Sequence, residues 1–96
     1  MDQKSTQTNL VIAKKDLKFV TVNMLNMNLL TIDFSDNKLV SIPDEICELQ
    51  QLQKLKLDRN ALQKLPDNIG HLRNLQVLTV SRNELVQIPA SLQNCR

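Results

Sequence analysis

The sequence has few of the residues from which catalytic sites and ligand-binding loops are usually built. Its 96 residues include one glycine, one histidine, two cysteines and two aromatic residues, both of them phenylalanine. A single glycine, Gly70, excludes a glycine-rich phosphate loop. His71 and the cysteines have no neighbours that would complete a nucleophile with its base or a metal site. We therefore expect no enzymatic activity, no cofactor and no bound metal.

An excess of charge of one sign and long apolar runs are also lacking. The 12 lysines and arginines and the 10 aspartates and glutamates leave a formal net charge of +2, and the two signs are interleaved. Without a basic tract or base-stacking aromatic residues, we expect no nucleic-acid partner. No segment approaches the ~20 apolar residues that span a membrane, and the first residues do not read as a signal peptide. Two cysteines without a disulfide-bonded cap favour a reduced, cytoplasmic compartment.

What the sequence does contain is a repeat of 23 residues, present three times. The copies occupy residues 29–51, 52–74 and 75–96, and the last copy ends one residue short of a full period. One asparagine, one proline and seven apolar positions recur in register. The asparagines are Asn37, Asn60 and Asn83, and the prolines are Pro43, Pro66 and Pro89. Such self-similarity is typical of solenoid proteins.

The second copy illustrates the structure that each repeat predicts. Alternation of Leu55 and Leu57 with Lys54 and Lys56 predicts a short strand with one buried face. Strands from successive copies are expected to stack in parallel into one curved sheet, about 4.8 Å apart. The asparagine then turns the chain, and its amide can donate to and accept from buried backbone groups, so the three asparagines should form a ladder. The proline and the apolar residues after it suit a short helical or 3₁₀ segment on the convex side.

The pattern LxxLxLxxNxLxxLPxxIxxLxx resembles the 23-residue intracellular leucine-rich repeat of the Ras-group type, which is found in Ras-suppressor proteins and Erbin-like scaffolds. The resemblance covers residues 29–96. It implies an α/β solenoid, a horseshoe segment with a parallel concave sheet, that binds a protein partner as a signalling scaffold or regulator in small-GTPase pathways. Two alternatives remain open. One is a regulatory or targeting subunit of an enzyme complex, and the other is a fragment or short isoform of a longer protein with no autonomous activity.

The two ends of the chain are less regular than its middle. Residues 1–6 are polar and are expected to be disordered, whereas residues 7–28 read as a degenerate capping repeat with Lys15 in the place of the asparagine. The alternative for this segment is an upstream repeat truncated at a gene-model or splice boundary. Its apolar positions would be Leu10, Ile12, Leu17, Val20, Met24 and Met27. The third repeat ends without a polar cap, which predicts an open strand edge available for self-association.

Residues that bind a partner are expected at the outward positions of the strands, on the concave face. Arg59 and Arg82 occupy one repeat position, and together they could grip an acidic residue of a partner. The alternative is that each of these charges only solvates the sheet. The candidate partner-binding residues are Thr31, Asp33, Asp36, Lys54, Lys56, Asp58, Arg59, Thr79 and Arg82.

Overall fold

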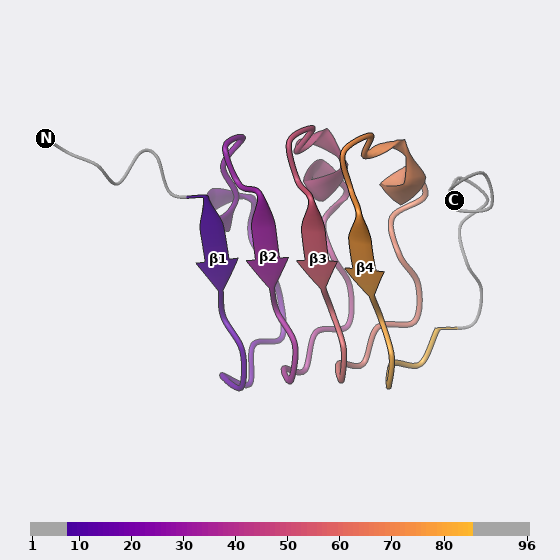
Figure 1. Cartoon of the computed structure of the whole chain (residues 1–96). Coiled ribbons are helices and arrows are strands. Elements are labelled where there is room, and N and C mark those ends of the chain that lie inside the picture. The colour runs from indigo at the N-terminus through magenta and orange to yellow at the C-terminus, as the bar shows by residue number, and fades with distance from the viewer. Residues whose placement is uncertain (1–7, 86–96) are drawn as a thin grey trace, which may run out of the picture.

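The computed structural model describes residues 8–85, which contain four short strands in one parallel sheet. The strands are β1 (Asn9–Val11), β2 (Thr31–Asp33), β3 (Lys54–Lys56) and β4 (Val77–Thr79). They lie side by side in chain order, so each coil of the chain places one strand next to that of the coil before it (Figure 1). The expected disordered segment 1–6 and the expected uncapped end of the third repeat lie outside the described residues.

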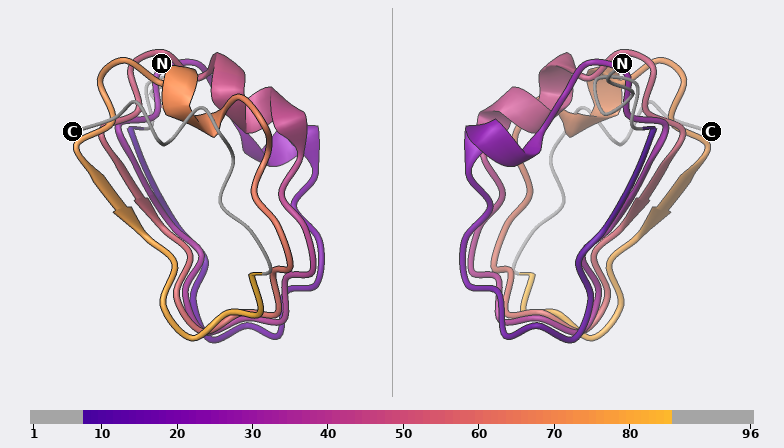
Figure 2. Two further views of the ribbon diagram at one scale, coloured as in Figure 1. Left: turned by 90° about the vertical axis from the view of Figure 1, so that its right-hand side faces the viewer. Right: turned by 90° about the vertical axis from the view of Figure 1, so that its left-hand side faces the viewer.

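Three 3₁₀ helices lie across the coil from the strands, as a view along the stack shows (Figure 2). They are η2 (Val22–Met24), η3 (Asp44–Glu48) and η4 (Ile69–His71). η3 begins directly after Pro43, whose fixed φ and missing N–H suit the start of a short helix, and η4 begins three residues after Pro66. In η4, for example, the Ile69 amide donates to the Pro66 carbonyl. The expected α/β solenoid, with a parallel sheet and short 3₁₀ segments, is confirmed.

The strands are aligned residue for residue. Ile32 pairs with Leu55, and Leu55 pairs with Leu78, so the offset between coils equals the repeat period. Side chains alternate between the two faces of a strand, and these three residues point toward the core. The side chains on the opposite face form what we call the outer sheet face, which is the face expected to be concave. Its members are Asn9, Val11, Thr31, Asp33, Lys54, Lys56, Val77 and Thr79.

The core is a stack of aliphatic layers to which each coil contributes one residue per layer. All seven apolar positions of the first two repeats are buried. Burying one such side chain contributes roughly 1.5–3 kcal/mol. A single coil cannot cover its own layer, so this contribution depends on stacking against neighbouring coils. The buried residues of the second repeat are Leu52, Leu55, Leu57, Leu62, Leu65, Ile69 and Leu72.

An asparagine turns the chain beyond the end of each of the strands β2, β3 and β4. The Oδ1 atom of Asn60 accepts a hydrogen bond from the Leu39 amide of the preceding coil at 3.0 Å, and its Nδ2 atom donates to the Phe34 carbonyl of that coil at 3.1 Å. Asn37 and Asn83 make equivalent bonds to the coils that precede their own. Each amide therefore satisfies backbone groups of the coil before it, as well as groups of its own coil.

The residue before each of these asparagines has a left-handed backbone conformation. The angle φ is 59° at Asp36, 56° at Arg59 and 57° at Arg82, and Lys14 occupies the same position in the first coil with φ of 59°. This conformation costs roughly 1–2 kcal/mol for a residue other than glycine. The hydrogen bonds around the asparagine hold the turn against that cost.

The first coil departs from the sequence expectation on its convex side. Met27, expected in an apolar core position, is 56% exposed, and Leu25 packs against the core instead. The reason is the place where the helix ends: η2 ends at Met24, the repeat position of Ile46, whereas η3 continues to Glu48, so the chain is already extended at Leu25. Lys15 stands where the following coils have an asparagine, so this coil has no side-chain amide there. The backbone N–H of Lys15 instead donates to the Oδ1 atom of Asn37 at 3.0 Å. The asparagine of the second coil thus also anchors the first.

Replacing Asn60 with alanine should destabilise the fold, because it leaves backbone groups of two coils without partners. We expect the free energy of unfolding to fall by about 1–3 kcal/mol in a urea denaturation followed by circular dichroism. Asn23→Ala is the matched control, because Asn23 is exposed and its side chain has no hydrogen bond among residues 8–85. Equal loss of stability in the two variants would contradict a specific role for the Asn60 amide.

Candidate functional site

The outer sheet face brings five of the candidate residues, together with Val77, into two rows. The parallel register places neighbouring members of a row on adjacent strands, about 4.8 Å apart. The lysines of β3 are exposed, while the neighbouring β2 and β4 residues are half-buried. β1 extends the rows with Asn9 and Val11, which the sequence reading did not include. The rows are Thr31, Lys54 and Val77, and then Asp33, Lys56 and Thr79.

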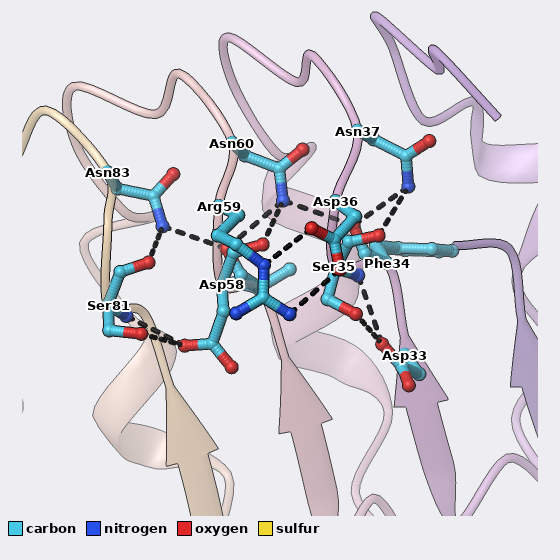
Figure 3. Close-up of polar contacts among 11 residues, drawn as sticks. Asp33, Phe34, Ser35, Asp36, Asn37, Asp58, Arg59, Asn60, Ser81 and Asn83 are labelled. Carbon is cyan, nitrogen blue, oxygen red and sulfur yellow. Dashed lines mark hydrogen bonds and ion pairs between the residues drawn. The ribbon is translucent and has the colours of Figure 1, made fainter. Parts of the chain in front are cut away.

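The remaining candidate residues lie beyond the strand ends. Asp36, Arg59 and Arg82 belong to the turn before the asparagine, not to a strand. This corrects the expectation that they are outward strand positions, because a left-handed residue ends the alternation of a strand. Figure 3 shows this region beside the three asparagines. We call it the rim and define it as Ser35, Asp36, Asp58, Arg59, Ser81 and Arg82.

An ion pair joins two coils at the rim. The guanidinium of Arg59 reaches the carboxylate of Asp36 in the preceding coil with two nitrogens, and the Nη2–Oδ2 distance is 2.8 Å (Figure 3). The hydrogen bond from Arg59 is the main cause that holds the pKa of Asp36 below its ordinary value, and the same bond raises the pKa of Arg59. Arg59 is thus already engaged within the chain. The ion pair with Asp36 competes with the expected joint grip of Arg59 and Arg82 on a partner residue, and that grip stays a prediction.

Two further carboxylates accept hydrogen bonds from serines. Asp58 accepts from the amide and the hydroxyl of Ser81 in the next coil, both at 2.8 Å, and Asp33 accepts from Ser35 in its own coil. Partial burial raises the pKa of Asp58, but hydrogen bonding outweighs it and leaves the pKa below its ordinary value. The hydroxyl of Thr79 is buried and makes no hydrogen bond within residues 8–85. We therefore attribute the lowered pKa to the bonds from Ser81.

Within the described part of the chain, three cations of the outer sheet face and rim have no acidic partner. Lys54 and Lys56 are exposed on β3, and Arg82 is exposed beyond β4. None of them makes an ion pair or a side-chain hydrogen bond with residues 8–85. The carboxylates around them each accept bonds from a serine or an arginine. The charge left available to a partner on this side is therefore positive.

Comparison with known proteins identifies the architecture. Two models of the leucine-rich repeat match adjoining parts of the chain, residues 28–49 and residues 50–96. The chain is a leucine-rich repeat solenoid. The models name the repeat without naming the Ras-group type, which stays a prediction.

One solved structure is similar to this solenoid over most of its length. It is a leucine-rich repeat protein of Leptospira interrogans, with 38% sequence identity and a TM-score of 0.75 over 81% of this chain. The solenoid described here spans only 20% of that protein. No curated protein matches the chain. The similarity therefore concerns the leucine-rich repeats and does not extend to the rest of that protein.

Residues 8–85 of the solenoid offer little else that could support chemistry. They hold no group of three His, Cys, Asp or Glu side chains placed to bind a metal, and they form no helix long and apolar enough to cross a membrane. A cavity of about 120 Å³ lies between η3 and η4, lined by Asp44, Cys47, Asp67 and Asn68. Burial, followed by the charge of Asp44, raises the pKa of the Cys47 thiol to about 11. At neutral pH the thiol is protonated and therefore a poor nucleophile.

The side-chain contacts between neighbouring coils were not predicted from the sequence, although the repeat contains a signal for them. Asp36 and Arg59 occupy one repeat position in neighbouring coils, which brings opposite charges about one strand spacing apart. Asp58 and Ser81 are also one period apart. Complementary side chains separated by 23 residues could therefore have indicated both contacts. Arg82 has no acidic residue at its own position in the preceding coil.

Replacing Arg59 with glutamine should raise the pKa of Asp36 toward its ordinary value of 3.8, because the variant removes the main cause of the lowering. In the unmodified chain this pair favours folding above pH 3.8, and the contribution is lost as the pH falls through the lower pKa of the folded state. An NMR titration of the side-chain carboxyl carbons measures the shift. Lys38→Gln removes another surface cation and should leave Asp36 unchanged. An unchanged Asp36 titration in the Arg59 variant would show that the pair does not form in solution.

The raised pKa of Cys47 predicts slow alkylation. A change from 9.0 to about 11 leaves roughly 100-fold less thiolate at pH 7.5. We expect iodoacetamide to modify Cys47 in the folded chain about that much more slowly than in the urea-unfolded chain. Peptide mapping by mass spectrometry assigns the modification to this cysteine. Equal rates in the two states would contradict the protected thiol.

Proposed function

We propose that this solenoid is a non-catalytic interaction module whose protein partner binds across the outer sheet face and the rim. Leucine-rich repeat domains generally mediate protein–protein interaction. Stacked coils hold the backbone of neighbouring strands in fixed register, so the surface is preorganised before the partner arrives. A preorganised surface loses less conformational freedom on binding than a flexible one does.

The observation that carries this proposal is the imbalance of available charge. Lys54, Lys56 and Arg82 have no acidic partner among residues 8–85, whereas the carboxylates near them accept internal hydrogen bonds. An acidic segment of the partner complements such a surface and is steered toward it. A single exposed ion pair contributes only about 0–1 kcal/mol. Several contacts must therefore act together, and Val77 beside Lys54 adds an apolar one.

The wider role that we propose is a signalling scaffold or regulator in the cytoplasm, with small-GTPase pathways as the context. The support is the 23-residue pattern, whose resemblance is to repeats of Ras-pathway scaffolds. The free thiol of Cys47 is in keeping with a reducing compartment.

Charge reversal on β3 tests the proposed surface. We expect the variant Lys54→Glu with Lys56→Glu to bind a fluorescein-labelled peptide of eight glutamates at least tenfold more weakly than the unmodified chain. Fluorescence anisotropy at low ionic strength measures the affinity. Added salt should weaken binding of the peptide to the unmodified chain, because it screens the charges.

The matched control is Lys18→Glu with Lys64→Glu, which changes the net charge by the same amount. Both lysines are exposed and follow the turn that leaves the sheet, so they lie off the outer sheet face. We expect this control to bind the peptide nearly as well as the unmodified chain. An equal loss in both double variants would assign the binding to net charge rather than to the outer sheet face. Failure of the unmodified chain to bind would rule out the acidic partner.

A further inference from the structure

A groove lies between the first two 3₁₀ helices. These helices lie on the side of the solenoid across from the sheet (Figure 2). It contains a cavity of about 100 Å³ to which two successive coils contribute. We call it the convex groove. Its main lining residues are Val22, Leu25, Met27, Glu45, Glu48 and Leu49.

Exposed apolar residues set this groove apart from the groove between η3 and η4. Asp44 and Asp67 follow the prolines of their coils, whereas the same position in the first coil holds Val22, which is 49% exposed. Met27 is also more than half exposed, where the next two coils bury a leucine. Adjoining exposed apolar side chains with a polar edge are typical of interaction sites. At the Val22 position the first coil therefore presents an apolar side chain where the next two coils present an acid.

The volume of the cavity limits what can occupy it. Pockets for small-molecule ligands and cofactors measure roughly 300–1,000 Å³, which is several times the volume of this cavity. A water molecule takes about 30 Å³ of liquid volume, so the space exceeds that of a single water. The cavity suits one aliphatic side chain. This points to a segment of protein rather than to a free metabolite.

The charge of the groove selects among protein segments. Glu45 and Glu48 are exposed on the second coil, and neither makes an ion pair within residues 8–85. No lysine or arginine is among the residues described as lining the cavity. A basic residue beside an inserted apolar side chain would find a carboxylate within reach, and charge-assisted hydrogen bonds to carboxylates are among the stronger ones. An acidic segment would be repelled.

We propose that the convex groove docks a partner segment in which one apolar side chain is flanked by lysine or arginine residues. The apolar side chain enters beside Val22 and Met27, next to Leu49, while the cations lie at Glu45 and Glu48. This site is separate from the outer sheet face. It allows the solenoid to hold two segments of opposite charge on opposite sides.

The experiment is an NMR titration of the ¹⁵N-labelled full chain with a designed peptide that carries one leucine between two pairs of arginines. We expect amide shifts at η2 and η3 and none at β3. A second peptide with serine in place of the leucine should bind at least fivefold more weakly, because it leaves the cavity empty.

Two variants and one control complete the test. Val22→Asp gives the first coil the residue that the next two coils carry at this position, so the repeat pattern tolerates it. We expect this variant and Glu48→Lys each to weaken binding of the leucine peptide at least fivefold. Glu84→Lys reverses an exposed carboxylate outside the groove and should leave the affinity unchanged.

Several outcomes would overturn the proposal. Shifts centred on β3, equal affinity of the Val22→Asp variant and the unmodified chain, or no binding of the leucine peptide would each remove the groove as a docking site for a basic partner. Sedimentation tests the other occupant. A dimer of the unmodified chain that Val22→Asp abolishes would show that a second copy fills the groove instead.

Discussion

Wherever the chain leaves the sheet in this solenoid, it carries backbone N–H and C=O groups across the edge of an apolar core, away from water. A buried group of this kind costs about 1–3 kcal/mol if it has no partner. The amides of Asn37, Asn60 and Asn83 provide partners in two coils at once. Because these bonds form only when one coil lies in register on the next, the asparagines fix the spacing of the strands and of every surface built on them.

The same register determines which charges remain available at the surface. Asp36 meets Arg59, and Asp58 meets Ser81, because the members of each pair are one repeat apart. These contacts hold carboxylates between coils, while Lys54 and its neighbouring cations stay unpaired within residues 8–85. On the opposite side, the first two 3₁₀ helices combine exposed apolar residues with glutamates that make no ion pair among the described residues. The two sides of one coil stack therefore differ in both charge and polarity.

The repeat predicted the parallel sheet and the short 3₁₀ segments because both depend on an apolar pattern that recurs in every repeat. Met27 shows where such a pattern fails: its residue type suits the core, but the 3₁₀ helix of the first coil ends earlier in the repeat and Leu25 turns inward instead. Arg59 shows a second limit of prediction from sequence. Whether its guanidinium is free for a partner depends on Asp36, which lies one coil away. The left-handed turn at Arg59 had no signal at all, because glycine or asparagine normally marks that conformation.

That left-handed position links the backbone to the chemistry of the surface. A glycine there would remove most of the conformational cost and would leave the asparagine bonds in place. The position instead holds Lys14, Asp36, Arg59 and Arg82, all of them charged, and the one glycine of the chain, Gly70, lies elsewhere. Exchange of one of these residues for glycine would therefore change backbone strain and surface potential in a single step. At this position the thermal stability of the turn and the charge offered to a partner are coupled.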